Sequence, residues 1–419
     1  MTPRRLDARP TAPLKRFCRI SYGLGQPPKL SEGGVPILRA TNIDRGRIDP
    51  NDLIYARVED LPINRAPLLS EGEILVVRSG AYTGDSARIS SEWTGAAPGY
   101  DLRLTPTQVD SRFLAYVLRT ASFADRIELV KNRAAQPHLN AEELGNIGIP
   151  ALPLRLQRRI ADFLDAETAH IDALITRKRL LVEKLQERFL GFVGEAVCLV
   201  PDPGDPLNIR PSEVEGLPVV PARLAWRFRL GSGTTPRSDI DRYYSNVGIP
   251  WVVTGDLRDR YIDHVSRSVT REALADHSAL VLHDAGSVVV AMYGATIGRL
   301  ARLSTAATVN QACCVISRAK DDLPDFVFYW LLGFRRELID RGRGAGQPNI
   351  SQETLKEIRI ALPSPHVQRR IIDMLDKERA RVDELVGLLD RQTSLLQEHR
   401  QALMTAAVTG EMEVPGVPT

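Results

Sequence analysis

The apolar positions of this chain follow two different periods, and each period occurs twice. Short apolar, β-branched runs bounded by glycines lie at 73–77 and 287–291, a pattern typical of buried strands. Later in each half, apolar residues recur every three, four or seven positions with charged residues between them, as in a coiled-coil helix. The chain is therefore expected to contain two strand-rich segments, each followed by a long helix.

The two long helices are expected from Leu156 to about Val197 and from Val367 to about Val408. Their apolar positions are Ile160, Leu164, Ile171, Leu174, Leu181, Leu185, Phe189 and Phe192 in the first, and Ile371, Leu375, Val382, Leu385, Leu389, Leu396 and Leu403 in the second. At 1.5 Å per residue each helix would be roughly 60 Å long. Since no single globular domain needs such a rod, the two helices are expected to pair and so bury their apolar stripes.

The two halves of the chain are copies of one another. A segment from Gly72, GEILVVRSGAYTGDSAR, matches GSVVVAMYGATIGRLAR from Gly286, and VPILRATNI from Val35 matches IPWVVTGDL from Ile249. Further on, AQPHLNAEELGNIGIPALPLRLQRRIADFLD matches GQPNISQETLKEIRIALPSPHVQRRIIDMLD. Because the order and the spacing of the blocks are kept, the sequence indicates a duplication.

Each copy has glycine-bounded tight turns after its strand and a helix-start signal before its long helix. Gly80 and Gly84 bracket the first turn, and Gly294 and Gly298 the second. Asn140 followed by Glu143 predicts a capping box and a short helix, and Ser351 occupies the matching place.

The fold class predicted is α+β, with two similar mixed α/β domains and two long antiparallel helices forming an intramolecular coiled coil. Two copies in one chain favour a pseudo-twofold arrangement, with the domains held tens of ångströms apart. The boundaries expected are a first domain at 1–150, a helix at 151–200, a linker at 201–216, a second domain at 217–362, a second helix at 363–410 and a tail at 411–419 that frays.

Composition narrows the class of protein. The sequence has no run of about 18 apolar residues that could span a bilayer, and its basic N-terminal segment lacks the apolar stretch of a secretory signal, so a cytoplasmic location is expected. Cys18, Cys198, Cys313 and Cys314 have neither disulfide nor zinc spacing, and we interpret them as small buried hydrophobic residues. The net charge of +3 does not by itself indicate a polyanionic partner. Only eight of the 55 basic residues are lysines, which suits contacts to phosphate or guanine but also follows from a GC-rich genome.

Motifs for catalysis are missing. The sequence contains no GxxxxGK[ST] loop, no Asn/Asp-Pro-Pro-Tyr/Phe motif of amino-methyltransferases, no nucleophile elbow and no HExxH zinc site. The histidines lack partners at ligand spacing, and we interpret them as structural or surface residues. No cofactor and no metal are therefore expected, and the chain is expected not to be an enzyme.

The duplicated blocks, together with LLQEHRQALMTAAVTGEM from Leu395, resemble the specificity subunits of type I restriction-modification systems along essentially the whole chain. This resemblance implies two target-recognition domains and an antiparallel coiled coil. It also implies a non-catalytic subunit that recognises a bipartite, asymmetric site in double-stranded DNA. Two methyltransferase subunits, and often restriction subunits, would dock on it. The first half departs from the pattern, because its helix lacks the Thr409-Gly410 ending and its domain is shorter.

The candidate DNA contacts lie in the repeated blocks, the glycine turns and the basic loops before the capping turns, with three more in the second domain ahead of its first repeated block. They are Arg39, Thr41, Arg78, Tyr82, Arg88, Lys131, Arg133, Arg237, Tyr243, Tyr244, Thr254, Tyr293, Thr296, Arg299, Arg341 and Arg343. Differences at matched turn positions, such as Arg78 against Met292, are expected if the two domains read different bases. Neutral drift and solvated loops would explain the same pattern. The alternative function is a coiled-coil scaffold that binds proteins and does not read DNA.

Overall fold

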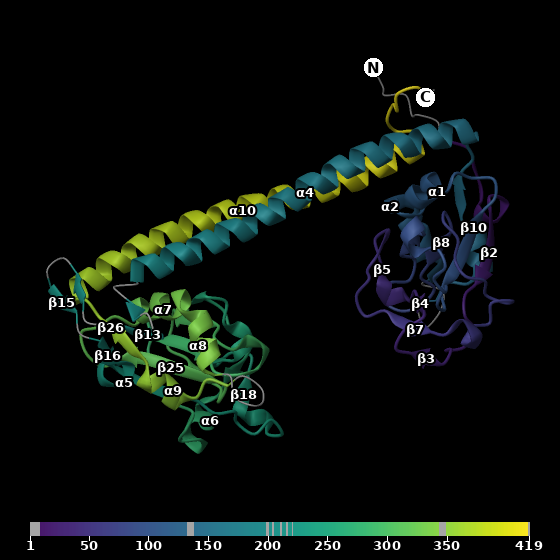
Figure 1. Ribbon diagram of the computed structural model, residues 1–419. Coiled ribbons are helices and arrows are strands. Elements are labelled where there is room, and N and C mark those ends of the chain that lie inside the picture. Colours follow the sequence, from purple (N-terminus) through teal and green to yellow (C-terminus); the bar gives the residue numbers. More distant parts are fainter. Residues whose placement is uncertain are drawn as a thin grey trace. The chain divides into compact units, whose positions relative to one another are not determined.

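A computed structural model gives the fold of the chain (Figure 1). It describes residues 9–131, 138–197, 201–202, 205–209, 212–214, 217–219, 221–342 and 349–417, with only the backbone of Lys131 and of 201–219. The chain divides into two compact units, Met1–Lys178 with Asp390–Thr419 (unit 1) and Arg179–Leu389 (unit 2). Each unit contains one lobe and part of both long helices. We call residues 9–150 the first lobe and residues 221–362 the second lobe.

The first lobe is built on a four-stranded antiparallel sheet in the order β2-β10-β8-β9. Its strands are β1 (Thr11–Pro13), β2 (Cys18–Tyr22), β3 (Leu30–Ser31), β4 (Val35–Ile37), β5 (Ile43–Asp44), β6 (Arg47–Ile48), β7 (Ile54–Ala56), β8 (Ile74–Val76), β9 (Ser86–Arg88), β10 (Leu102–Pro106) and β11 (Gly148–Pro150). Its helices are α1 (Ser111–Leu118), α2 (Ala121–Lys131) and α3 (Ala141–Asn146), with 3-10 turns η1 (Leu14–Arg16), η2 (Ala40–Asn42), η3 (Val58–Asp60) and η4 (Ser91–Trp93).

Strand β8 is apolar throughout because both faces of the sheet are covered. Ile74 and Val76 pack into a core shared with α1, α2 and the first long helix, whereas Leu75 packs on the opposite face with Leu38 and Ile43. A fully buried strand shows a continuous apolar run instead of alternation, which is the pattern on which this strand was predicted.

The second lobe repeats this plan with a five-stranded sheet in the order β17-β25-β22-β23-β20. Its strands are β16 (Pro221–Arg223), β17 (Phe228–Ser232), β18 (Tyr244–Ser245), β19 (Ile249–Val252), β20 (Arg260–Ile262), β21 (Ser268–Val269), β22 (Val288–Ala291), β23 (Leu300–Leu303), β24 (Thr308–Val309), β25 (Cys313–Arg318) and β26 (Arg359–Ala361). Its helices are α5 (Leu224–Arg227), α6 (Arg271–Asp276), α7 (Pro324–Gly333), α8 (Arg335–Arg341) and α9 (Gln352–Glu357), with 3-10 turns η5 (Asp241–Tyr243), η6 (Thr254–Asp256) and η7 (Gly294–Thr296).

The two lobes begin their last helices in the same way, as predicted. The Asn140 side chain accepts a hydrogen bond from Glu143 N–H at 2.8 Å, and the Glu143 carboxylate accepts one from Asn140 N–H at 3.0 Å. In the second lobe the Ser351 hydroxyl accepts from Thr354 N–H at 3.0 Å. The predicted capping box and the matching serine cap are therefore both present.

The long helices are α4 (Leu154–Val197) and α10 (Pro365–Thr409). In unit 1 the first turns of α4, with Ile160, share a core with the last turns of α10, with Met404. In unit 2 the last turns of α4, with Val193, share a core with the first turns of α10, with Leu375. The helices therefore run antiparallel in each unit (Figure 1), and the predicted fold class is confirmed.

The coiled-coil seam differs in part from the predicted one. Leu181 and Leu385, both assigned to it from sequence, are 49% and 39% exposed. Ile175 is buried, and Val182 and Val386 are half-buried one position beyond the residues predicted. A seam alternates steps of three and four residues. Because the residue next to each predicted position is also apolar, the sequence did not decide which of the two lies in the seam.

Two parts of the chain are more structured than expected: the segment that connects the two lobes, and the C-terminal tail. The segment contains β12 (Pro201–Asp202), β13 (Asp205–Ile209), β14 (Ser212–Val214) and β15 (Leu217–Val219). In the tail, Val414 and Val417 are buried in the core of unit 1, and Arg159 donates a hydrogen bond to the Gly416 carbonyl. The expectation of a fraying tail is therefore wrong up to Val417, because apolar contacts hold it.

Candidate functional site

Equivalent loops follow the central strand of each sheet and carry several of the predicted contacts. In the first lobe, Val77 N–H donates to Asp85 C=O at 2.8 Å and Gly84 N–H to Val77 C=O at 2.8 Å. In the second lobe Ala291 pairs with Arg299 and Gly298 in the same pattern, at 2.9 Å for both bonds. The backbone scaffold of the two loops is therefore the same.

Arg78 stands at the start of the first loop and is held from several sides. Its N–H donates to the Asp101 carboxylate at 3.2 Å, and its carbonyl accepts from Leu139 N–H at 2.8 Å. Its guanidinium carbon lies 5.1 Å from the centre of the Tyr22 ring, and Nη2 lies 3.5 Å from Nε2 of His138. The half-buried side chain is thus oriented by a cation–π contact.

A surface cleft opens beside Arg78. It has a volume of about 530 Å³ and is lined by Tyr22, Leu24, Gly25, Arg78, Ser79 and Tyr100. Tyr22 and Tyr100 are 46% and 42% exposed, and Tyr82 on the same loop is 55% exposed. The two exposed tyrosines that line the cleft with Arg78, Tyr22 and Tyr100, provide stacking surfaces and hydrogen-bond donors for a planar polar ligand.

The equivalent loop of the second lobe carries different side chains. Met292 replaces Arg78 and is buried, while Tyr293 is 38% exposed and forms a β-bridge with Asn349. Thr296 is half-buried and Arg299 is exposed on the same loop. The predicted residues of this loop therefore lie together at one surface, with a chemistry unlike that of the first loop.

Four predicted contacts are engaged inside their lobes. Arg88 Nε donates to the Ser111 hydroxyl at 2.9 Å, and an Arg39 nitrogen donates to the Asp52 carbonyl at 2.5 Å. The Tyr243 hydroxyl donates to Asp276 at 2.9 Å from a buried ring, and the Tyr244 hydroxyl donates to the Pro236 carbonyl at 2.7 Å. Each of these four side chains therefore has a hydrogen-bond partner within its lobe, and its contact with DNA stays a prediction.

The remaining predicted residues are dispersed. Thr41 and Arg237 are exposed, with Arg237 paired to Asp239 at 2.7 Å, and Thr254 is half-buried in η6. Arg341 ends α8 with an exposed side chain. Arg133, Arg343 and the side chain of Lys131 lie outside the described residues, as does Cys198.

Sequence analysis did not identify Tyr22, Tyr100 and Asp101 as parts of the site, and it interpreted His138 only as a structural or surface residue. These residues come from three separate segments that the sheet brings to one edge. Asp101 is 3% exposed, and burial raises the pKa of its carboxyl to about 6. No repeated block quoted from the sequence covers Tyr22, Tyr100 or Asp101.

A buried glutamine joins each lobe to a long helix. In unit 1, Gln157 of α4 accepts from Asp110 N–H at 2.8 Å and donates to the Leu152 carbonyl at 2.7 Å. In unit 2, Gln368 of α10 accepts from Leu323 N–H at 2.9 Å and donates to the Pro363 carbonyl at 2.8 Å. Because both side chains are almost fully buried, these bonds fix the lobe on its helix.

A tyrosine and a helix carboxylate strengthen each junction. Tyr116 donates to Asp165 of α4 at 2.7 Å, and Tyr329 donates to Asp376 of α10 at 2.5 Å. Arg302, which corresponds to Arg88 of the first lobe, also reaches Asp376 at 2.9 Å from a buried position. Within each unit, hydrogen bonds therefore join the lobe directly to the helix.

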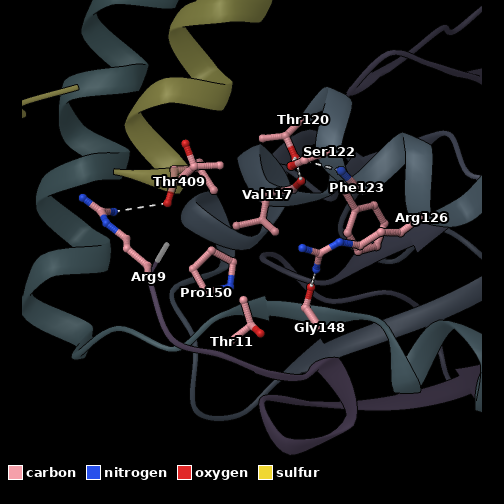
Figure 2. Close-up of a pocket in the computed structure, with 11 residues that line it drawn as sticks. Arg9, Thr11, Val117, Thr120, Ser122, Phe123, Arg126, Gly148, Pro150 and Thr409 are labelled. Carbon is pink, nitrogen blue, oxygen red and sulfur yellow. Dashed lines mark hydrogen bonds between the residues drawn. The ribbon is translucent and has the colours of Figure 1, made fainter. Parts of the chain in front are cut away.

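A cavity of about 90 Å³ lies where the start of the chain meets the end of α10 in unit 1 (Figure 2). Arg9 donates to the carbonyls of Ala407 and Val408 at 3.2 Å, and Arg126 donates to the Gly148 carbonyl. Drug-sized ligands occupy roughly 300 Å³ or more. The cavity is therefore too small for a cofactor, and its two arginines donate hydrogen bonds to backbone carbonyls.

The described cysteines are buried side chains and do not belong to a metal site. Cys18, Cys313 and Cys314 are buried, and burial raises the pKa of each thiol to about 12, which fits their interpretation as small hydrophobic residues. The described residues contain no cluster of three or more His, Cys, Asp or Glu suited to a metal ion. Among the helices of that part of the chain, none is both long and apolar enough to cross a membrane.

Comparison with known proteins connects both lobes to one family. Residues 28–184 and 228–385 match the family described as type I restriction modification DNA specificity domain. The chain is 22% identical over 413 residues to the putative type I restriction enzyme MjaX specificity subunit of Methanocaldococcus jannaschii, covering 94% of this chain and 91% of that protein.

Other similarities are shorter or purely structural. The chain is 36% identical over 85 residues to the type I restriction enzyme EcoDI specificity subunit of Escherichia coli, a match that spans 20% of this chain and 19% of that protein. A solved structure from work on complex assembly and conformational transition of the type I R-M system has the same fold. It aligns with a TM-score of 0.72 at 17% identity, over 98% of this chain and 100% of that one.

Proposed function

This chain belongs to the family of type I restriction modification DNA specificity domains, and we propose that each of its lobes reads one half of a bipartite, asymmetric site in double-stranded DNA. The observation that carries the proposal is the pair of equivalent loops after β8 and β22. They have the same backbone hydrogen bonds but different side chains that are exposed or half-buried, Arg78 and Tyr82 in one and Tyr293, Thr296 and Arg299 in the other.

Two readers on one scaffold suit an asymmetric target. A base pair is distinguished by the side chains that reach its edge, whereas backbone contacts only position the protein. A conserved loop backbone with exchanged side chains therefore supports readout of two different half-sites. The joining of each lobe to α4 or α10 through Gln157 or Gln368 supports this function, because a reader must be oriented before it meets the groove.

The long helices would serve as the spacer and as the docking surface for partners. We place methyltransferase subunits, two per chain, on these helices, with restriction subunits as further partners in the complex and the cytoplasm as the location. Exposed apolar side chains on these helices support a protein partner, because contact with a partner would remove this apolar surface from water. These side chains are Leu180, Leu181, Leu190, Met374 and Leu388 in unit 2 and Leu395 in unit 1. The chain itself would be non-catalytic.

Binding of the full chain, with and without a co-expressed methyltransferase subunit, to a randomised duplex library tests the proposal. We expect selection of one split motif with two unlike halves. Affinity should fall by roughly a thousand-fold or more between about 50 and 200 mM salt, if about six phosphates are neutralised. Binding that ignores sequence and salt would contradict the proposal and favour a protein scaffold.

Exchange of the second lobe, residues 221–362, for that of a relative separates the two functions further. A DNA reader predicts that only one half of the selected motif changes, because each lobe contacts its own half-site. Lys320→Ala in the unexchanged chain is a control for loss of one exposed charge of the second lobe outside the loops. A motif that stays the same after the exchange would contradict DNA readout by the lobe.

A further inference from the structure

The side chains at the mouth of the cleft beside β8 show which base the first lobe is built to read. Arg78 presents a half-buried guanidinium whose Nη2 faces His138. Nη2 carries two N–H groups, of which only one can face His138, and within the described part of the chain Nε and Nη1 have no hydrogen-bond partner, so one fork, Nη2 with either Nε or Nη1, remains available for a ligand. An arginine that presents two parallel donors matches the O6 and N7 acceptors of guanine in the major groove.

The orientation of this guanidinium is fixed before any ligand arrives. Its guanidinium carbon lies over the ring of Tyr22, whose hydroxyl in turn accepts a hydrogen bond from Ala141 N–H at 3.2 Å. The backbone of Arg78 is held at both ends by Asp101 and Leu139. An arginine that is already ordered loses little conformational entropy on binding, which raises its discrimination between bases.

The walls of the cleft are held together by a close backbone approach. A Cβ atom at Gly23, directly after β2, would lie 2.3 Å from the Gly99 carbonyl oxygen, and Gly99 itself has a φ of +50°. Only glycine permits this contact at position 23. It brings together the segments that carry Tyr22 and Tyr100, which line the cleft together with Arg78.

The second lobe keeps the scaffold and lacks this set of side chains. Ile350 N–H donates to the Met292 carbonyl at 2.7 Å, as Leu139 does to Arg78, and the strand register places Ser232 where the first lobe has Tyr22. The β-bridge of Ser79 with His138 corresponds to that of Tyr293 with Asn349. The arginine, its aromatic support and its histidine neighbour are therefore all replaced together.

We propose that Arg78 is a specificity-determining residue that reads a guanine in the half-site of the first lobe, and that the half-site of the second lobe has no equivalent contact. This inference rests on the proposed function and adds the identity of one base to it. The half-site of the first lobe must then contain a G·C pair.

The experiment uses the full chain, with its co-expressed methyltransferase subunit, on duplexes that carry the selected motif with one base pair changed at a time. The lobe exchange assigns each half-site to its lobe. We expect Arg78→Ala to abolish discrimination at one G·C pair of the first half-site, a loss of roughly 5- to 150-fold, and to leave the second half-site unchanged. Arg78→Lys should lose most of that discrimination yet keep the salt dependence, because lysine retains the charge without the fork.

Arg16→Ala removes an equal charge from an exposed position of the first lobe and should leave base preference unchanged. Equal weakening on all duplexes by Arg78→Ala would mean a phosphate contact and would overturn the inference, as would a first half-site without a G·C pair. In those outcomes the wild-type chain still selects a split motif, so the proposed function stands. A wild-type chain without any sequence preference would instead remove the proposed function and this inference together.

Discussion

Asp101 is a buried carboxyl group that supports the loop of Arg78. Its side chain accepts the Arg78 N–H at 3.2 Å, and only 3% of the residue is exposed. Burial raises the pKa of this carboxyl from 3.8 to about 6, against the smaller lowering effects of the hydrogen bond and the charge of Arg78. The folded chain therefore binds this proton more tightly than the unfolded chain does.

We predict that Asp101 makes the first lobe less stable as the pH rises from about 4 to about 6. Because the folded-state pKa is raised, this group adds to the free energy of unfolding below pH 3.8. That contribution, about 3 kcal/mol in all, is lost as the pH rises through 6. Asp101→Asn keeps an oxygen acceptor for Arg78 N–H and cannot ionise. Urea unfolding followed at Trp93 should show the difference between the two chains changing in this pH range. A constant difference from pH 4 to 7 would contradict the prediction.

The chemistry of single residues was only partly predictable from the sequence. Arg78 and Tyr82 were found because the duplication aligns them with Met292 and Thr296. Asp101 and Tyr22 were not, since they join the cleft through sheet pairing between strands distant in the chain. Arg88 looked like its exposed neighbours in sequence, yet its strand position directs it to Ser111 of α1.

At the scale of elements, each lobe depends on one buried glutamine at the start of a long helix. Gln368 makes three side-chain hydrogen bonds, one of them to the buried carboxylate of Asp322 at 2.7 Å, whereas Gln157 makes two. A buried polar group that loses its partner costs about 1–3 kcal/mol, and more if it is charged. Removal of Gln368 should therefore be the more disruptive change.

We predict that Gln368→Ala speeds hydrogen exchange at the Leu323 amide by about 10- to 100-fold through local opening where α7 meets α10. Gln157→Ala should have a smaller effect, at the Asp110 amide. Each variant is the control for the other, because the two glutamines lie in different units. Unchanged protection at Leu323 in Gln368→Ala would show that the junction does not depend on this side chain.

The long helices themselves were predictable, but their exact seam was not. Apolar spacing in the sequence identified both helices, and the pseudo-twofold arrangement expected of two copies predicted their antiparallel pairing. It could not choose between Leu181 and Val182, or between Leu385 and Val386, because both members of each pair are apolar. Packing decided the register, with Ile171, Ile175 and Val182 of α4 on the inner face. The side chains left outside, such as Leu181, are those we assign to partner binding.

At the scale of the whole molecule, the proposed function requires the paired helices to set the distance between the two half-sites on DNA. Two lobes can read one face of a duplex if their separation changes in steps of a helical turn, about 34 Å or about 10.5 base pairs. One heptad lengthens each helix by about 10.5 Å, which matches about three base pairs of DNA. Three extra base pairs also rotate one half-site by roughly 100° around the duplex axis relative to the other. Three heptads add about 32 Å, close to a full turn in both distance and phase.

We predict that three heptads inserted in both helices, after Lys178 and after Leu389, preserve recognition with a gap about ten base pairs longer and both half-sites unchanged. These points lie close together, since Lys178 donates to Gln392 across the pair at 2.5 Å, and whole heptads keep the seam continuous. Single-heptad insertion in both helices keeps the same seam and is the matched control. It should weaken binding at every gap length, because distance and phase then disagree. Selection from libraries with variable gaps measures both chains, and an unaltered gap in the three-heptad chain would show that the helices do not set the spacing.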